Sequence, residues 1–344
     1  MNRQIQGLVP PIVTLAAENI AIKGNVFGTS NTERAKWAED LNLHKNGETI
    51  FFAGCGYQDI SGLERLWSIV GGKDKGAIAI DPACQQNERR ERPKIDLSRI
   101  DNERAAQAIH AHTQPLRDAV KVLHMFGIDF GYLAEDEPCC GGPLYFFGLH
   151  TEFNRNAKKI HKELKSLGVR RIISMVPSCT YTLRNLISDC VEGYELEIRH
   201  WSEVVSECVD QVRLQLPEEV KVTYHDPCLL SRYLRIIEQP RKILRAIEGV
   251  ELIEPERSRE EWTTCCGGGG GFQATFPELG HIIAMNRVKE LVETGAEIVV
   301  TQCPACISML RNGLEELKVD NVGVVDLAEI VARAMGPKGN IKDG

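Results

Sequence analysis

Residues 220–228, VKVTYHDPC, form an apolar, strand-like run that ends at a cysteine. The same arrangement recurs at residues 47–55 (GETIFFAGC), 170–179 (RRIISMVPSC) and 296–303 (AEIVVTQC), with helical stretches between the runs. This alternation predicts an α/β fold with largely parallel strand pairing. The carboxyl ends of parallel strands form the sites of such sheets, so we expect the cysteines there to gather in crevices. Expected strands lie near 50–53, 128–133, 171–176, 195–199, 221–224, 250–253 and 297–301.

The order of cysteines repeats once along the chain. The second half has Cys228, thirty-six residues, Cys265-Cys266, thirty-six residues and then Cys303-Pro-Ala-Cys306. The first half has Cys55, eighty-three residues, Cys139-Cys140, thirty-eight residues and then Cys179-Thr-Tyr-Thr182, which puts Thr182 at the fifth position. We therefore expect two tandem related α/β repeats. The predicted divisions are an N-terminal linker or docking segment (1–45), a first repeat (46–215) with an insertion near 60–110, and a second repeat (216–337).

Composition restricts the class of protein. The chain has 344 residues, a net charge of -7 and a sequence pI of about 5.8, and an acidic balance argues against nucleic-acid binding. No apolar run is long enough to span a bilayer, and no secretion signal is recognisable, so we expect a cytoplasmic protein, free or docked on a larger assembly. Twelve cysteines in such a chain indicate metal binding or redox chemistry rather than structural disulfides.

The stretch TTCCGGGGGF (263–272) narrows the kind of metal site. Adjacent cysteines do not easily chelate one tetrahedral zinc, and five thiolates exceed its four ligands. They can hold different irons of one iron–sulfur cluster. Gly267, Gly268 and Gly269 would let backbone N–H groups approach an anionic cluster as a concave nest. A phosphate loop is disfavoured because the stretch lacks the lysine and the spaced glycines of nucleotide-binding loops. The zinc and iron–sulfur interpretations both stay open at this point.

The motifs HDPCLLSRY, CCGGGGG and TQCPACISML, together with FFAGC, EPCCGGP and VPSCTYTL, resemble the cysteine-rich CCG domain. Catalytic subunits of heterodisulfide reductase share that domain with relatives in glycolate and lactate oxidation and in sulfite-reduction-associated complexes. The resemblance implies an oxidoreductase subunit, active within a complex, that reduces or forms a disulfide at a non-cubane [4Fe–4S] cluster. The implied ligands are Cys228, Cys265, Cys266, Cys303 and Cys306, of which the first three belong to the catalytic cluster site.

For the first repeat, the resemblance implies a second iron–sulfur cluster at Cys55, Cys139, Cys140 and Cys179, or else a degenerate site. Cys84, inside the insertion, is a candidate for a missing ligand. His225 is a candidate proton donor to a departing thiolate, with a purely hydrogen-bonding role beside the cluster as the alternative.

The same resemblance implies partners. They are a ferredoxin-like iron–sulfur subunit, a flavoprotein or membrane cytochrome b subunit, and a thiol or disulfide substrate, with a peripheral place on the inner face of the membrane through the complex. The alternative function is an electron-transfer subunit that links a dehydrogenase or flavoprotein to quinone or ferredoxin.

Overall fold

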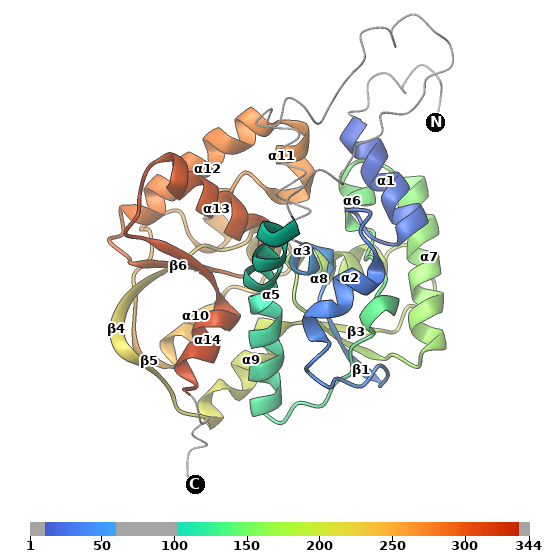
Figure 1. Ribbon diagram of the computed structural model, residues 1–344, viewed down its shortest axis with the longest axis horizontal. Coiled ribbons are helices and arrows are strands. Elements are labelled where there is room, and N and C mark those ends of the chain that lie inside the picture. The colour runs from blue at the N-terminus through green and yellow to red at the C-terminus, as the bar shows by residue number, and fades with distance from the viewer. Residues whose placement is uncertain (1–10, 60–101, 337–344) are drawn as a thin grey trace, which may run out of the picture.

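Two all-parallel sheets organise the chain in the computed structural model, which describes residues 11–59 and 102–336 (Figure 1). The first sheet has the order β1-β2-β3 and the second the order β5-β4-β6-β7. The strands are β1 (Thr49–Phe52), β2 (Arg171–Ser174), β3 (Glu197–His200), β4 (Leu214–Tyr224), β5 (Ile247–Leu252), β6 (Ile298–Thr301) and β7 (Gly323–Asp326). The predicted α/β fold with parallel pairing is confirmed. Cys84 and most of the predicted insertion lie outside the described residues.

One expected strand is wrong and one was not predicted. Residues 128–133 contribute a single bridge between Gly131 and Ile50. At Gly131 the chain passes so close to residue 46 that a Cβ would lie 2.2 Å from the Asn46 carbonyl oxygen, and its pairing with β1 is limited to this one parallel bridge. The short strand β7 was missed because GVVD is too brief to show an alternating pattern. Strand β4 begins at Leu214 and thus runs across the expected repeat boundary at 215/216.

Helices cover the two sheets and join them (Figure 1). They are α1 (Pro11–Lys23), α2 (Asn31–Ala35), α3 (Cys55–Gln58), α5 (Asn102–Met125), α6 (Gly142–Phe146), α7 (His150–Ser166), α8 (Pro177–Tyr181), α9 (Trp201–Cys208), α10 (Glu238–Arg245), α11 (Phe272–Thr275), α12 (Pro277–Val292), α13 (Pro304–Glu316) and α14 (Leu327–Ala334). None of these described helices is both long and apolar enough to cross a bilayer. The segment predicted as a linker is helical from Pro11 and buries Trp37 against the first half.

The two halves share one structural motif, a strand that leads into a capped helix. Each sheet ends in a strand that passes directly into a helix, β3 into α9 and β7 into α14. The last strand residue, His200 or Asp326, caps the helix, and a glutamate three residues later, Glu203 or Glu329, accepts from the capping residue's backbone N–H. Such a capping box satisfies two free N–H groups at once and fixes the helix start. This shared geometry supports the tandem relationship of the halves.

A buried hydrogen bond ties the halves together. The Tyr57 hydroxyl, on α3 of the first half, donates to the carboxylate of Asp326 at the end of β7 in the second half. Both side chains are fully buried, and burial raises the pKa of Asp326 to about 7. One hydrophobic core continues across this contact, from Phe51 in the first sheet to Leu327 at the start of α14. The halves therefore form one packed body.

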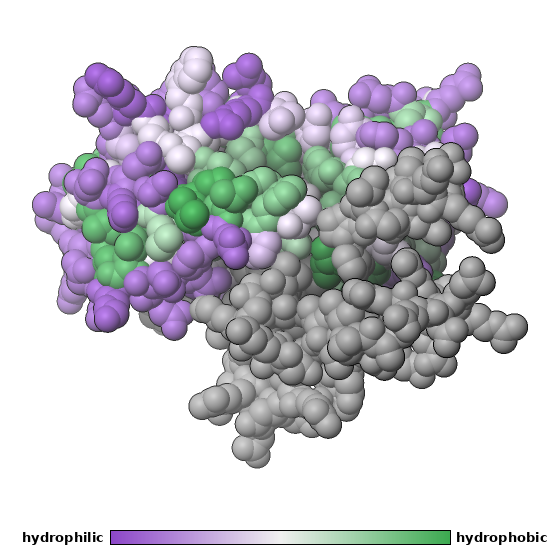
Figure 2. All heavy atoms as spheres, turned by 90° about the horizontal axis from the view of Figure 1, so that it is seen from above, coloured by the Kyte–Doolittle hydropathy of each residue, from purple (hydrophilic) through white to green (hydrophobic). Residues whose placement is uncertain are grey.

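An apolar patch remains exposed on α11 and α12. Phe276, Leu279 and Ile282 are each about half exposed, and Phe272 lies beside Phe276 with 5.4 Å between ring centroids. Figure 2, which views the molecule from above, shows hydrophobic side chains gathered on this upper face. Apolar patches of this kind commonly mark interaction sites.

Replacing Tyr57 with phenylalanine should lower the free energy of unfolding by about 1–3 kcal/mol, because the buried Asp326 carboxylate loses a donor. Chemical denaturation followed by circular dichroism measures the change. Tyr194→Phe is the matched control, since the Tyr194 hydroxyl is buried without a hydrogen-bond partner among the described residues. Equal losses in the two variants would contradict the assigned role of the Tyr57 contact.

Candidate metal centre

Five cysteines of the second half converge on one point. The Sγ atoms of Cys266 and Cys306 lie 3.1 Å apart. The thiol of Cys228 contacts that of Cys265, and the thiol of Cys303 contacts that of Cys306. These residues come from the end of β4, the glycine-rich loop of residues 265–271, the end of β6 and the first turn of α13. We name them the second cysteine group; the parallel topology brings them together as the sequence predicts.

The glycine-rich loop holds its shape through Gly267. This residue has a φ of 82°, and its N–H donates to the Sγ of Cys265 over 3.3 Å. A Cβ on Gly267 would lie 2.1 Å from the carbonyl oxygen of Gly280 on α12, so no other residue fits. Gly269 faces the group too, with the Cys228 Sγ 3.8 Å from the position of its missing Cβ. The loop thus packs against α12 while its backbone stays close to sulfur.

The second cysteine group is partly accessible. Cys228, Cys265 and Cys303 are half-buried, whereas Cys266 and Cys306 are buried. The neighbouring thiol of Cys265, followed by burial, raises the pKa of Cys228. Hydrogen bonds from Cys228, Cys266 and the Gly267 N–H lower the pKa of Cys265. The hydrogen bond from Cys306 likewise lowers the pKa of Cys303. Cys265 and Cys303 are therefore the thiols of the group that ionise most easily, and thiolate is the form that binds metals.

His225 lies beside this group with a fixed tautomer. Its Nδ1 accepts a hydrogen bond from Nε of Arg287 over 3.0 Å. Arginine only donates, so the neutral imidazole carries its proton on Nε2. That Nε2 has no partner among the described residues, and a ring nitrogen of His225 lies within 4.8 Å of both the Cys266 and Cys306 sulfurs. Burial lowers the pKa of His225 well below its ordinary value, and Arg287 adds to this effect. The neutral ring thus presents an unused donor.

Arg287 is a buried cation next to the thiols. It is fully buried on α12, where Nη1 donates to the Ser258 hydroxyl over 2.7 Å and to the Glu290 carboxylate over 2.8 Å. Its Nη2 has no partner among the described residues. The sequence reasoning missed this residue, although Ala284, Arg287, Val288 and Leu291 share the buried face of α12. A cation on such a face signals a buried anion nearby.

Four cysteines of the first half form a second cluster of thiols, which we name the first cysteine group. The thiols of Cys55, Cys139, Cys140 and Cys179 contact one another in that order, and all four are buried. The hydrogen bond with Cys140 is the largest cause that raises the pKa of Cys139 to about 12. Packed thiols this resistant to ionisation need a positive centre to become thiolates.

A cation also reaches the first cysteine group. Arg34, on α2, places Nη1 3.7 Å from the Cys55 Sγ and 2.5 Å from the Gln58 Oε1. Its Nη2 donates to the Glu137 carbonyl over 3.0 Å, and the side chain is 3% exposed. Nothing in the local sequence predicts this, because Arg34 is distant from every cysteine along the chain. Each group thus has one buried arginine.

The structure corrects the expected alignment of the two halves. In each, two residues follow the end of a strand, β2 or β6, and then a proline starts a helix, α8 at Pro177 and α13 at Pro304. Cys179 therefore corresponds to Cys306, and Val176 corresponds to Cys303. Thr182 does not stand in the place of a fifth cysteine. The shared proline was the sequence signal that the spacing of cysteines obscured.

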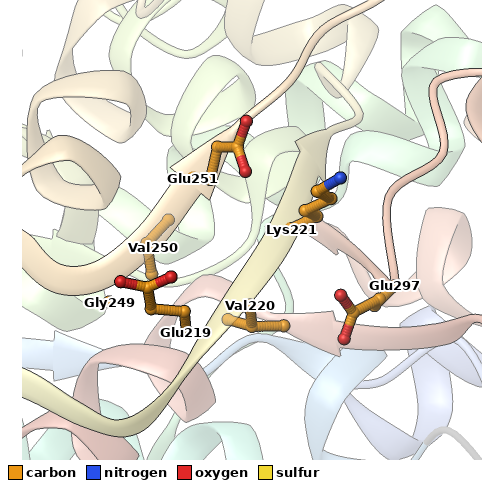
Figure 3. Close-up of a pocket in the computed structure, with 7 residues that line it drawn as sticks. All are labelled: Glu219, Val220, Lys221, Gly249, Val250, Glu251 and Glu297. Carbon is orange, nitrogen blue, oxygen red and sulfur yellow. The ribbon is translucent and has the colours of Figure 1, made fainter.

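A separate cavity of about 430 Å³ lies on β4, β5 and the start of β6 (Figure 3). Its lining residues are Glu219, Val220, Lys221, Gly249, Val250, Glu251 and Glu297. None of these lining residues is a cysteine, so this cavity is not part of either cysteine group.

Comparison with known proteins agrees with the geometry. Residues 104–184 and 222–311 match the sequence profile of the cysteine-rich domain CCG. One subunit of the dihydromethanophenazine:CoB–CoM heterodisulfide reductase from Methanosarcina acetivorans is 34% identical over 224 residues, covering 63% of this chain and 54% of the relative.

Two bacterial proteins are similar over nearly the same share of the chain. A probable iron-sulfur-binding oxidoreductase, FadF, from Bacillus subtilis is 33% identical and covers 62% of this chain and 30% of the relative. An EtfAB:quinone oxidoreductase from Syntrophomonas wolfei is 30% identical and covers 63% of this chain and 31% of the relative. The match spans about half the length of the methanogen protein and less of the other two.

Gly267→Ala should destabilise the protein by more than about 2 kcal/mol, because it combines a strained left-handed backbone with a clash against Gly280. Gly269→Ala is the matched control, since its new methyl group would meet nothing closer than 3.8 Å. Thermal denaturation of both variants measures the difference. A Gly267→Ala protein as stable as the Gly269→Ala protein would refute the described loop.

Proposed function

Because the chain carries two copies of the cysteine-rich CCG domain, we propose that it is the iron–sulfur subunit of a heterodisulfide-reductase-like complex. A non-cubane [4Fe–4S] cluster would be held by Cys228, Cys265, Cys266, Cys303 and Cys306, and a disulfide would be reduced or formed there. One observation carries the proposal: five thiols from separate segments meet, and three of them remain accessible from outside.

The residues around the second cysteine group fit such a cluster. Five sulfur donors exceed the four that a structural zinc ion accepts. The Gly267 N–H, the unpartnered His225 Nε2–H and the cation of Arg287 all offer positive charge to the same region of the described chain. Iron–sulfur clusters ligated by thiolates are anionic, and N–H donors to their sulfurs tune their potentials. The donor set and its surroundings therefore favour iron and sulfide over zinc.

The protein side of the chemistry follows from access and hydrogen bonding. A bound cluster supplies single electrons, so a disulfide that takes up two electrons and two protons yields two thiols. The half-buried faces of Cys228, Cys265 and Cys303 leave room for substrate sulfur to approach. We assign to His225, whose Nδ1 is held by Arg287, the role of donating its unpartnered Nε2–H in the reacting region, where it would stabilise negative charge on sulfur. Arg287 in turn keeps the ring in the donating tautomer.

Partner subunits would supply the electrons and the link to the membrane. We propose a ferredoxin-like iron–sulfur subunit as electron donor, with a flavoprotein or a membrane cytochrome b subunit completing a complex at the inner face of the membrane. Two observations support a place in a complex. The longer relatives include one subunit of a heterodisulfide reductase and a quinone oxidoreductase, and the apolar patch on α11 and α12 begins directly after the glycine-rich loop.

A second function has its own support. The similarity to an EtfAB:quinone oxidoreductase favours an electron-transfer subunit that links a dehydrogenase or flavoprotein to quinone or ferredoxin. The two functions differ in their response to thiols. Titration of the anaerobic protein with candidate thiols should produce a new paramagnetic signal by electron paramagnetic resonance if the centre acts on disulfides. An unchanged spectrum favours electron transfer alone.

Cys266→Ser should remove most iron and acid-labile sulfide from the second cysteine group, because a buried ligand at the centre of the group is lost. Metal analysis of anaerobically purified protein measures the loss. Cys208→Ser is the control, as this half-buried thiol on α9 belongs to neither group. Zinc without iron in the unmodified protein would refute the proposed function.

His225→Phe should lower the reduction potential of the second centre by roughly 60 mV, since one charge-assisted hydrogen bond is worth about 1.4 kcal/mol. His225→Gln retains an N–H donor and should restore part of the shift. A spectroscopic redox titration measures all three proteins at equal iron content. Identical potentials would show that the Nε2–H makes no contact with the cluster.

A further inference from the structure

We propose that the first cysteine group binds a cubane-type [4Fe–4S] cluster through four thiolates and is closed to substrate, because Val176 occupies the position of the fifth cysteine. The inference rests on the proposed function, since it assumes iron–sulfur chemistry in both CCG domains. One side chain, valine in the first site and cysteine in the second, then determines how many sulfur ligands each of two otherwise equivalent sites provides.

The backbone has the same type of conformation at Val176 and at Cys303. Each residue precedes the proline that begins a helix, and each has an extended conformation, with ψ of 126° at Val176 and 124° at Cys303. The CCG profile ends at residues 184 and 311, which lie equally far beyond Cys179 and Cys306. Both the geometry and the family match thus pair Val176 with Cys303.

The glycines support this pairing independently. Gly141 and Gly267 follow the paired cysteines with φ of 78° and 82°. The next residue in each half is also a glycine. A Cβ on Gly142 would lie 2.6 Å from Thr182 Oγ1, and a Cβ on Gly268 would lie 2.7 Å from Met309 Cγ. Thr182 therefore corresponds to Met309, which packs against the second cysteine group.

The side chain of Val176 faces the first cysteine group. A Cβ placed on Gly54 would lie 2.7 Å from a Val176 methyl carbon and 3.0 Å from the Cys179 Sγ. Gly54 directly precedes Cys55 and has a φ of 72°. The valine methyl group thus fills space between two ligand-bearing segments, where Cys303 supplies sulfur in the other half. A hydrocarbon there coordinates nothing, so four thiolates remain, the number that a cubane cluster requires.

Closure distinguishes this site from its counterpart in the second half. All four thiols are buried, and Arg34 covers Cys55 from α2. No substrate sulfur can reach the described thiols of the group without moving this segment. The site nevertheless lies next to the second one, because the segment of Cys55 touches that of Cys303: a Cβ on Gly56 would lie 2.7 Å from Pro304 Cγ. The first site thereby becomes a relay from the ferredoxin-like donor to the second site.

The test isolates each site in the full-length protein by substituting one ligand of the other site. In a Cys266→Ser background, the remaining iron should number about four per chain and give a cubane spectrum by Mössbauer and electron paramagnetic resonance spectroscopy. Adding Val176→Cys should change this spectrum toward that of the second site, which is recorded alone in a Cys55→Ser background. Thr182→Cys, the matched control, should leave the spectrum unchanged.

The outcomes separate the two proposals. No iron in the Cys266→Ser background, with iron retained in the Cys55→Ser background, overturns the four-thiolate site and leaves the proposed function standing. No iron in either background overturns the proposed function. A spectral change with Thr182→Cys but not with Val176→Cys overturns the alignment. Val176→Ala guards against misfolding, because it adds no ligand and should keep the cubane spectrum; a different spectrum counts against the proposal.

Discussion

The parallel direction of the strands is the constraint on which both cysteine groups depend. Parallel strands end at the same edge of their sheet, so residues that follow β4 and β6 become neighbours although more than seventy positions separate Cys228 from Cys303. The same holds for Cys55 and Cys179 after β1 and β2. Burying so many thiols is unfavourable for their ionisation, and the glycine N–H groups and buried arginines offset part of that cost.

The local sequence pattern was enough to predict the α/β fold, most strands and the cysteines that converge. It did not predict features that depend on contacts between residues far apart in the sequence. Arg34 reaches Cys55 through α2, and Arg287 orients His225 across sixty-two positions, which no spacing rule relates. The alignment of Thr182 with Cys306 failed because counting cysteines ignores where a helix begins. Strand ends and proline positions, which the backbone fixes, give the correct pairing of Cys179 with Cys306.

The halves are alike in backbone and differ in side chains at a few decisive places. One group presents three half-buried thiols, a histidine donor and five sulfurs; the other presents four buried thiols under an arginine. The two copies share one framework, and the change of cysteine to valine is the basis of the separate roles proposed for them. The hydrogen bond of Tyr57 with Asp326 joins the two copies directly.

The difference in burial also determines how sensitive each of the two sites is to oxygen. Dioxygen and chelators attack iron where solvent reaches the ligands, and of the two described groups only the second has ligands open to solvent. With the proposed clusters bound, exposure to oxygen would remove iron from the second site first and leave the enclosed first site loaded. A preparation handled in air would then retain iron and colour while lacking the centre proposed to react with substrate.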